Sequence, residues 1–197
     1  MHLVLASSSP RRRELLTAAG LTFDVMAADI DERQHEGEAP EAYARRMAIE
    51  KAAAVRPQAG DHPVLGADTI VVAGGVVLGK PVDDADATRM LQALSGTSHE
   101  AMTAVALWWP GASAPDVALE RARVWMREIT PEEIAAAVAT GQLQDKAGAY
   151  AIQGLASRWI TRIEGAPGTV VGLPVETVDR LLRLRASGAY SVSRDEG

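Results

Sequence analysis

The sequence predicts an α/β domain built on a mixed, twisted sheet, and three observations support this fold class. Strand-like and helix-like segments are mixed along the 197 residues without strict alternation, a pattern typical of a sheet that contains both parallel and antiparallel strands. Hydrophobic residues make up 47% of the chain, enough for one core at this length without disulfides or structural metals. No internal repeat or low-complexity block divides the chain. We therefore expect a single domain over residues 1–185.

The first half of the chain is predicted to contain three strands and three helices. Residues 2–6 have the composition of a short buried strand, and Ser9 and Pro10 are then a candidate N-cap and first helical position, with Gly20 as the stop. Apolar residues at helical spacing predict a second helix from Pro40 to Arg56. The remaining expected elements are strands at 64–72 and 76–78, joined by a glycine turn, and a helix over 83–96.

The second half is predicted to continue with a long β-hairpin and two helices. Its strands are expected at 101–109 and 117–129, and Thr130 with Glu133 forms a capping box that begins a helix. We expect a loop with a short strand over 141–155, a strand over 159–163 and a helix from Pro174. Residues 186–197 are small and polar and are expected to form a flexible tail. The four tryptophans are expected in the core: Trp108, Trp109, Trp125 and Trp159.

Composition and charge exclude several classes of protein. With no cysteine, the chain has no disulfide framework, thiolate metal site or cysteine nucleophile, which fits the reducing cytoplasm. The net charge of -6 gives no broad attraction for nucleic acid or anionic lipid. Apolar runs are too short for a signal peptide or a membrane span. We therefore expect a cytoplasmic protein that binds neither nucleic acid nor membrane.

A candidate phosphate site lies at the first predicted helix start, in the segment SSSPRRR. It combines serine hydroxyls, unpaired backbone N–H groups and the guanidinium groups of Arg11, Arg12 and Arg13, all of which match phosphate oxygens. A capped surface helix with solvated arginines is the alternative on this segment alone.

Candidate metal ligands occur in two places. Asp68 lies inside the otherwise apolar strand GADTIV, where a carboxylate costs several kcal/mol unless a cation meets it. The cation is either a bound metal or a nearby basic side chain. The acidic run 29–32 ends in Glu32, a hard oxygen ligand of the kind that Mg²⁺ or Mn²⁺ prefers, although such a run is usually a solvated loop.

The segment GGVVLGK, residues 74–80, formally fits the start of a Walker A loop but does not predict an ATPase. Its next residue is Pro81, where a P-loop needs Ser or Thr, and its glycines are expected to turn a hairpin. Lys80 remains either a phosphate-binding cation or an ordinary surface lysine.

The segment DKAGAYAIQG, residues 145–154, is rich in small residues that permit close backbone approach. Gln153 offers both a donor and an acceptor, so it is able to read a nucleobase edge. A tight structural turn is the alternative. The four histidines are scattered, and we assign them no role.

Eight motifs taken in order resemble the Maf family of nucleotide pyrophosphatases over residues 3–184. They are SSSPRR, IDE, EKA, GADTIV, LGKP, SGTSH, DKAGAYAIQG and VVGLP. The resemblance implies a mixed α/β fold with two lobes around a central cleft, similar to inosine triphosphate pyrophosphatases, and a homodimer.

The resemblance also implies roles for individual residues. Ser7, Ser9, Arg11 and Arg12 would hold phosphates, and Lys51 and Lys80 would neutralise charge at the scissile linkage. Glu32 and Asp68 would bind a divalent cation (Mg²⁺, Mn²⁺ or Co²⁺), with Asp68 at the family's proton-acceptor position. Substrate binding would further involve Lys146, and base preference would involve Thr69 and Gln153 with Arg11.

The DKAGAY form of the late motif, together with Thr69, resembles the branch of the family that acts on dTTP and UTP. We therefore expect hydrolysis of these nucleotides, including modified pyrimidine nucleotides, to the monophosphate and pyrophosphate. The alternative is a nucleotide-sensing or division-regulating protein that binds without hydrolysis.

Overall fold

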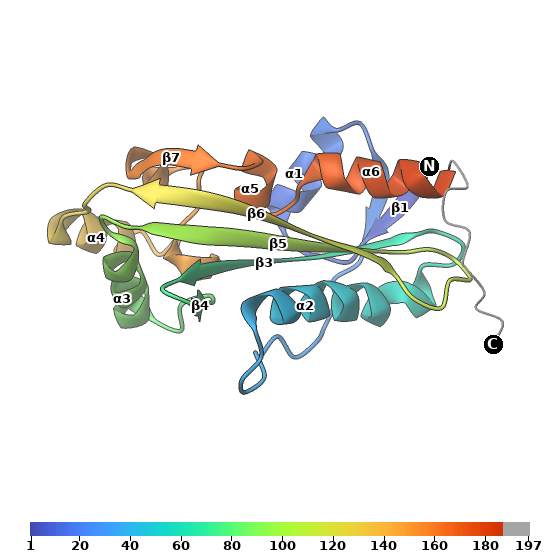
Figure 1. The fold of residues 1–197 in the computed structure, drawn as a ribbon, viewed down its shortest axis with the longest axis horizontal. Helices are drawn as coiled ribbons and strands as arrows, with labels where there is room; N and C mark the ends of the chain where they lie inside the picture. The colour runs from blue at the N-terminus through green and yellow to red at the C-terminus, as the bar shows by residue number, and fades with distance from the viewer. Residues whose placement is uncertain (187–197) are drawn as a thin grey trace.

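The computed structural model describes residues 1–186, and the predicted flexible tail lies outside this range from residue 187 onward. Long strands run the length of the molecule, with helices on both sides (Figure 1). The mixed α/β fold class predicted from the sequence is confirmed. The assignment of residues 1–185 to one two-lobed domain stays a prediction.

A seven-stranded sheet in the order β2-β1-β3-β5-β6-β7, with β4 paired to β3, forms the centre of the described chain. β1 is parallel to β2 and to β3, whereas every other pair is antiparallel. The strands are β1 (His2–Leu5), β2 (Thr22–Val25), β3 (Val64–Ala73), β4 (Val76–Leu78), β5 (Ser98–Trp108), β6 (Asp116–Met126) and β7 (Ile160–Glu164).

Helices cover both faces of this sheet. α2 lies along one face, and α1, α5 and α6 lie on the other, while α3 and α4 gather at the end where β7 lies (Figure 1). The helices are α1 (Pro10–Ala18), α2 (Pro40–Val55), α3 (Asp84–Leu94), α4 (Pro131–Val138), α5 (Pro167–Val171) and α6 (Val175–Ala186). Short 3₁₀ helices occupy Arg56–Gln58, Ala147–Ala149 and Leu155–Arg158.

The edge of β3 that faces β1 contains a gap. β1 pairs with β3 only at Val64 and Leu65, and β4 pairs with it only from Val71 to Ala73. Residues 66–70 therefore have no neighbouring strand on this side among the described residues. Side chains alternate between the two faces of a strand. The side chains of residues 66–70 on both faces of the sheet therefore border the same gap.

One predicted element is absent from the structure, and one strand and one α-helix were missed. The expected short strand within 141–155 is wrong, because Gly148 (φ 68°) and Ala149 (φ 58°) adopt left-handed conformations that interrupt an extended chain. Sequence patterns also missed β2, which is short and lacks clear alternation of apolar and polar residues, and the five-residue helix α5.

The expectation that all four tryptophans pack the core is wrong only for Trp125, because Trp108 and Trp109 pack against core clusters although they are half-buried. Only Trp159 is fully buried; Trp108, Trp109 and Trp125 are half-buried. An arginine guanidinium lies over each of these three rings: Arg56, Arg185 and Arg162, respectively. This arrangement is favourable because the cation meets the negative face of the ring.

Candidate functional site

A cavity of about 580 Å³ opens at the gap in the sheet, and every site residue predicted from the sequence lines it. Its walls come from the β1–α1 junction, the acidic loop before α2, α2 itself, β3, the turn after β4 and the 145–153 segment. The predicted residues on its wall are Ser7, Ser9, Arg11, Arg12, Glu32, Lys51, Asp68, Thr69, Lys80, Lys146 and Gln153.

Arg12 is a buried cation with neutral partners only. It is 9% exposed, and its guanidinium donates to the carbonyl of Gly172 (2.9 Å), to Ser7 Oγ (3.1 Å) and to Thr69 Oγ1 (3.3 Å). Within residues 1–186 it forms no ion pair. Burial lowers the pKa of Arg12, although the charges of Asp68 and Glu32 act in the opposite direction. Three of its five N–H groups are used, so this side chain is prepared to meet an anion.

The serines at this junction stabilise the turn before α1 and do not cap the helix with their side chains. Ser9 occupies the predicted N-cap position of α1, but its side chain makes no capping hydrogen bond. Instead, the backbone N–H of Ser9 donates to Ser7 Oγ (3.2 Å), the atom that also accepts from Arg12. The serine turn and the arginine are thus linked.

On the opposite face of β3, two lysines and two carboxylates form a connected cluster. Lys51 Nζ lies 2.6 Å from Asp68 Oδ1 and 2.9 Å from Glu32 Oε1. Lys80 Nζ lies 3.3 Å from Glu32 Oε2. The pair of Lys51 and Asp68 is buried, whereas Glu32 and Lys80 are partly exposed. Burial acts to raise the pKa of Glu32, but the two ammonium groups outweigh it, and the net pKa is lowered.

Gly66 permits this cluster to form. A Cβ at this position would lie 2.1 Å from the carbonyl oxygen of Ala48 and 2.8 Å from the backbone nitrogen of Ala52. Only glycine therefore allows α2 to approach β3 so closely, and Lys51 on α2 thereby reaches Asp68 two residues further along the strand.

The 145–153 segment supplies the third wall. Lys146 pairs with Asp145 and donates to the Gln142 carbonyl, while Arg11 Nη1 lies 3.9 Å from Asp145 Oδ2. Burial acts to raise the pKa of Asp145, but Lys146 and Arg11 outweigh it and lower the pKa. Gln153 is exposed on the cavity wall.

Three contributors to the site were missed by sequence reasoning. Thr103 is completely buried on β5 opposite Thr69, and their hydroxyl oxygens lie 2.9 Å apart. Its hydroxyl donates to the Thr169 carbonyl (2.6 Å). Gly172 offers its carbonyl to Arg12, and the Tyr43 hydroxyl donates to the Glu32 carbonyl (2.6 Å). A buried threonine or a backbone carbonyl leaves no periodic signal in the sequence. Only Tyr43, which lies within the predicted helix from Pro40 to Arg56, gave a signal by which it was identifiable.

The carboxylates present fit a divalent cation that also binds the substrate. Oxygens of Glu32 and Asp68 converge on one point, now occupied by the Lys51 ammonium. No group of three or more His, Asp or Glu side chains able to hold a metal occurs within residues 1–186. Mg²⁺ is usually bound by one or two carboxylates together with substrate phosphates and water. The two carboxylates are therefore suited to a cation that is also coordinated by phosphate oxygens of a ligand, and not to a cation coordinated by protein side chains alone.

The comparisons with known proteins agree with this arrangement. Residues 2–185 match the family described as Maf-like protein. A dTTP/UTP pyrophosphatase of Koribacter versatilis is 50% identical over 183 residues, covering 93% of this chain and 94% of the relative. Relatives of the same name from Geobacter sulfurreducens (49%, covering 94% and 97%) and Hahella chejuensis (51%, covering 90% and 89%) are similar to the same extent.

Among residues 1–186, none of the helices has the length and apolar character needed to span a membrane. With a matching family description over almost its whole length and relatives about half identical to it, the chain belongs to the Maf family.

Proposed function

We propose that this protein hydrolyses dTTP and UTP between the α and β phosphates, releasing the nucleoside monophosphate and pyrophosphate. One observation carries the proposal: the buried guanidinium of Arg12, without a carboxylate partner in residues 1–186, shares a cavity with the Lys51–Asp68 pair. A buried cation is costly unless an anion meets it, and a triphosphate supplies that anion. The names of the relatives support the choice of pyrimidine substrates.

Cationic side chains bind and orient the phosphates. Arg12 has N–H groups left for phosphate oxygens, and Arg11 and Lys80 on the cavity wall add positive charge. A triphosphate carries about four negative charges, and stabilising the charge that develops on the leaving pyrophosphate is the main catalytic demand. These residues satisfy that demand.

Asp68 and Lys51 act on the attacking water. In the free protein the Lys51 ammonium is shared by Asp68 and Glu32, so the carboxylate of Asp68 is occupied by this contact. When phosphate oxygens compete for Lys51, the carboxylate of Asp68 is released to accept a proton from water or to bind a cation. The buried position of Asp68 keeps other water away from it.

Glu32 and Asp68 would hold a divalent cation, Mg²⁺, Mn²⁺ or Co²⁺. When bound, such an ion polarises the phosphate and lowers the pKa of water. Lys51 then keeps the two carboxylates together whenever the cation is absent.

The base is read on the side of the cavity formed by Thr69 and Gln153. Thr69 offers a hydroxyl oxygen and Gln153 an amide with both a donor and an acceptor. These groups suit the imide edge shared by uracil and thymine. Modified pyrimidines that keep this edge belong to the same proposed class.

The experiment that tests the function is a panel of nucleoside triphosphates incubated with Mg²⁺, Mn²⁺ or Co²⁺, with pyrophosphate and orthophosphate measured separately. Pyrophosphate from dTTP and UTP is expected as the primary product, and chelation with EDTA should stop the reaction. Orthophosphate as the primary product would place the cut at a different bond. Tight nucleotide binding without any product would favour the nucleotide-sensing alternative.

The same proposal includes a homodimer in the cytoplasm. The family resemblance supports the dimer, and the absence of cysteine fits a reducing compartment. Sedimentation of the purified protein, with and without nucleotide, tests the oligomeric state.

A further inference from the structure

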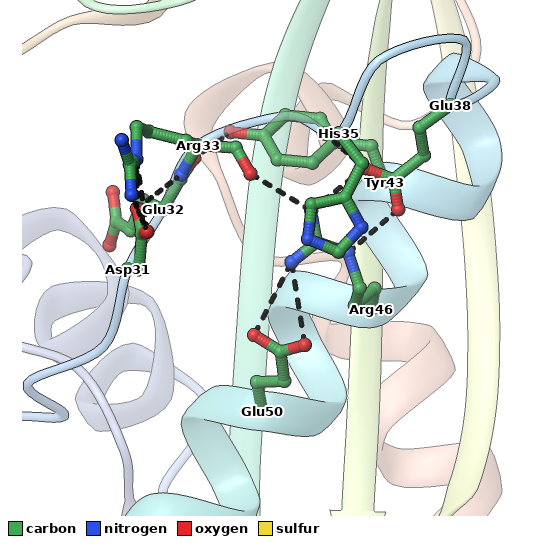
Figure 2. Close-up of polar contacts among 8 residues, drawn as sticks. All are labelled: Asp31, Glu32, Arg33, His35, Glu38, Tyr43, Arg46 and Glu50. Atoms are coloured by element: carbon green, nitrogen blue, oxygen red, sulfur yellow. Dashed lines mark hydrogen bonds and ion pairs between the residues drawn. The ribbon is translucent and has the colours of Figure 1, made fainter.

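We propose that Tyr43 and Arg46, on one face of α2, form a clasp that positions Glu32 over the cavity. The inference rests on the proposed function, because it gives these two residues their role through a carboxylate of that site. Figure 2 shows both side chains reaching from α2 toward the backbone of the acidic loop. Neither residue is required to touch the reacting atoms, so both are positioning residues.

The clasp holds two consecutive backbone carbonyls. The Tyr43 hydroxyl donates to the carbonyl of Glu32 (2.6 Å), and Arg46 Nη2 donates to the carbonyl of Arg33 (3.0 Å). Fixing the carbonyls of neighbouring residues restrains the backbone torsions between them. The Cα of Glu32 is thereby held at the position from which its carboxylate reaches Lys51 and Lys80.

Arg46 is itself held firmly. Its Nε and Nη2 atoms each donate to the Glu38 carboxylate at 2.7 Å, and Nη1 lies 3.4 Å from Glu50. The bond from Arg46 lowers the pKa of Glu38 to about 2. Glu38 also accepts from the backbone N–H of His35 (3.0 Å). A bidentate pair between Arg46 and the far end of the loop therefore closes the loop onto α2 (Figure 2).

The clasp matters because the loop has few other polar attachments. Residues 27–39 contain no helix or strand, and the other side-chain hydrogen bonds of this segment, such as those between Arg33 and Asp31, lie inside the loop. In residues 1–186 its other polar links to the protein are those from Glu32 to Lys51 and Lys80 and, at the start of α2, the bond that the backbone N–H of Tyr43 donates to the Ala39 carbonyl (3.0 Å). A triphosphate would compete for these two lysines. Tyr43 and Arg46 would then keep Glu32 in place at the moment it is needed.

Among the described residues the Tyr43 hydroxyl donates only to the Glu32 carbonyl. Its ring also lines the cavity, so Tyr43→Phe removes the hydroxyl that holds Glu32 and retains the wall. Arg46→Met removes the other half of the clasp and retains the apolar stem.

A double-mutant cycle with Glu32→Gln tests the proposal. Removing residues that orient a metal ligand typically costs about 10–100-fold in metal affinity or activity. We expect Tyr43→Phe and Arg46→Met each to lower kcat/KM for UTP by about tenfold or more on this basis. In the Glu32→Gln background, Tyr43→Phe should change kcat/KM by less than about twofold, because its effect passes through Glu32. Equal losses in the two backgrounds would overturn the proposal.

Calorimetric titration with Mn²⁺ in the presence of a non-hydrolysable UTP analogue, which supplies the phosphate ligands, gives a second measurement that does not depend on turnover. Tyr43→Phe should weaken Mn²⁺ binding by about tenfold while leaving the affinity for inorganic pyrophosphate at Arg12 unchanged. Unchanged Mn²⁺ affinity in both clasp variants would also overturn the proposal. This titration decides the matter if Glu32→Gln is too slow to assay.

Arg127→Met is the matched control. Arg127 makes a similar bidentate pair with Glu133 and donates to the Arg158 and Glu128 carbonyls, outside the cavity. It should lower the thermal stability as Arg46→Met does while keeping kcat/KM and Mn²⁺ affinity. If the wild-type protein released no pyrophosphate, the proposed function would be wrong. If it were active but the losses in kcat/KM from Tyr43→Phe and Glu32→Gln were additive, only the proposed role of the clasp would be wrong.

Discussion

The ammonium nitrogen of Lys51 lies 2.6 Å from a carboxylate oxygen of Asp68, although helix α2 and strand β3 place these residues 17 positions apart. Both side chains are buried, and the same ammonium lies 2.9 Å from Glu32. One lysine therefore contacts two carboxylates in the cavity.

The two members of this pair should differ in their effect on stability. Lys51→Met leaves Asp68 buried without a partner, so we expect the free energy of unfolding to fall by about 3–5 kcal/mol. Asp68→Asn leaves Lys51 paired with Glu32, and should destabilise by less than half as much. Urea denaturation of both variants measures the difference. Equal destabilisation would mean that Glu32 does not compensate.

Asp68→Asn should nevertheless lose nearly all turnover. Loss of a proton acceptor or a metal ligand typically costs about 10²–10⁴-fold in rate. We expect a reduction in kcat of at least about 100-fold with dTTP and UTP, in a protein that folds as the wild type does. The measurement is pyrophosphate release at saturating nucleotide, alongside circular dichroism. A variant that retained most of its activity would remove Asp68 from the chemistry.

Arg12→Met should separate binding from folding. Truncating one partner of a buried charge contact costs about 2–5 kcal/mol of binding, so the affinity for inorganic pyrophosphate should fall by about 30-fold or more. The free energy of unfolding of the free protein should change little, because Arg12 has no counter-ion in residues 1–186. Calorimetry measures the affinity for pyrophosphate, and denaturation measures the free energy of unfolding. A large loss of stability with unchanged affinity would give Arg12 a structural role.

Gly66→Ala should harm folding and catalysis together. The added Cβ would collide with the backbone of α2 at Ala48, and such overpacking typically costs about 1–3 kcal/mol. Relief requires α2 to move away from β3, which separates Lys51 from Asp68 and should lower kcat. Gly79→Ala, where a Cβ meets open space, is the control for the stability measurement. A Gly66→Ala protein as stable as wild type would contradict the close approach.

His99 should make folding sensitive to acid. Burial lowers its pKa from 6.5 to about 4, and its Nε2 atom lies 2.7 Å from the Tyr150 hydroxyl. Between these two pH values the unfolded chain binds the extra proton and the folded chain does not, so stability is lost as the pH falls from 6.5 toward 4. The shift corresponds to about 3 kcal/mol at most.

Denaturation across this pH range, compared with His99→Gln, measures the effect. The variant should show a shallower loss of stability with acid. The exposed His62→Gln variant retains His99 and should keep the wild-type loss. An unchanged acid profile in His99→Gln would assign the sensitivity to other groups.

Local chemistry in the sequence predicted most elements and several individual features of the site. Apolar residues at helical spacing placed α2 at the observed start, and Ala73-Gly74-Gly75 predicted the turn between β3 and β4. The expectation of a costly charge at Asp68 depended only on its apolar neighbours in the strand. Its alternatives, a metal or a basic partner, were left open by the sequence, and the structure shows Lys51 as the partner.

The list of site residues came mainly from the order of the family motifs. Spacing along the chain did not indicate that Arg11, Lys80 and Gln153 lie on one cavity, because no local pattern links segments separated by dozens of residues. All of them nevertheless line it.

The sequence by itself therefore determined most of the helices and strands, the family and the kinds of charge available, since these depend on residue type, motif order and short-range periodicity. Only the tertiary structure decided that β1 and β4 leave residues 66–70 of β3 open, and that Tyr43 and Arg46 reach the backbone beside Glu32. These relationships depend on strand register and helix packing, in which residues far apart in the chain meet. The site exists because that packing brings cations and carboxylates to one gap in the sheet.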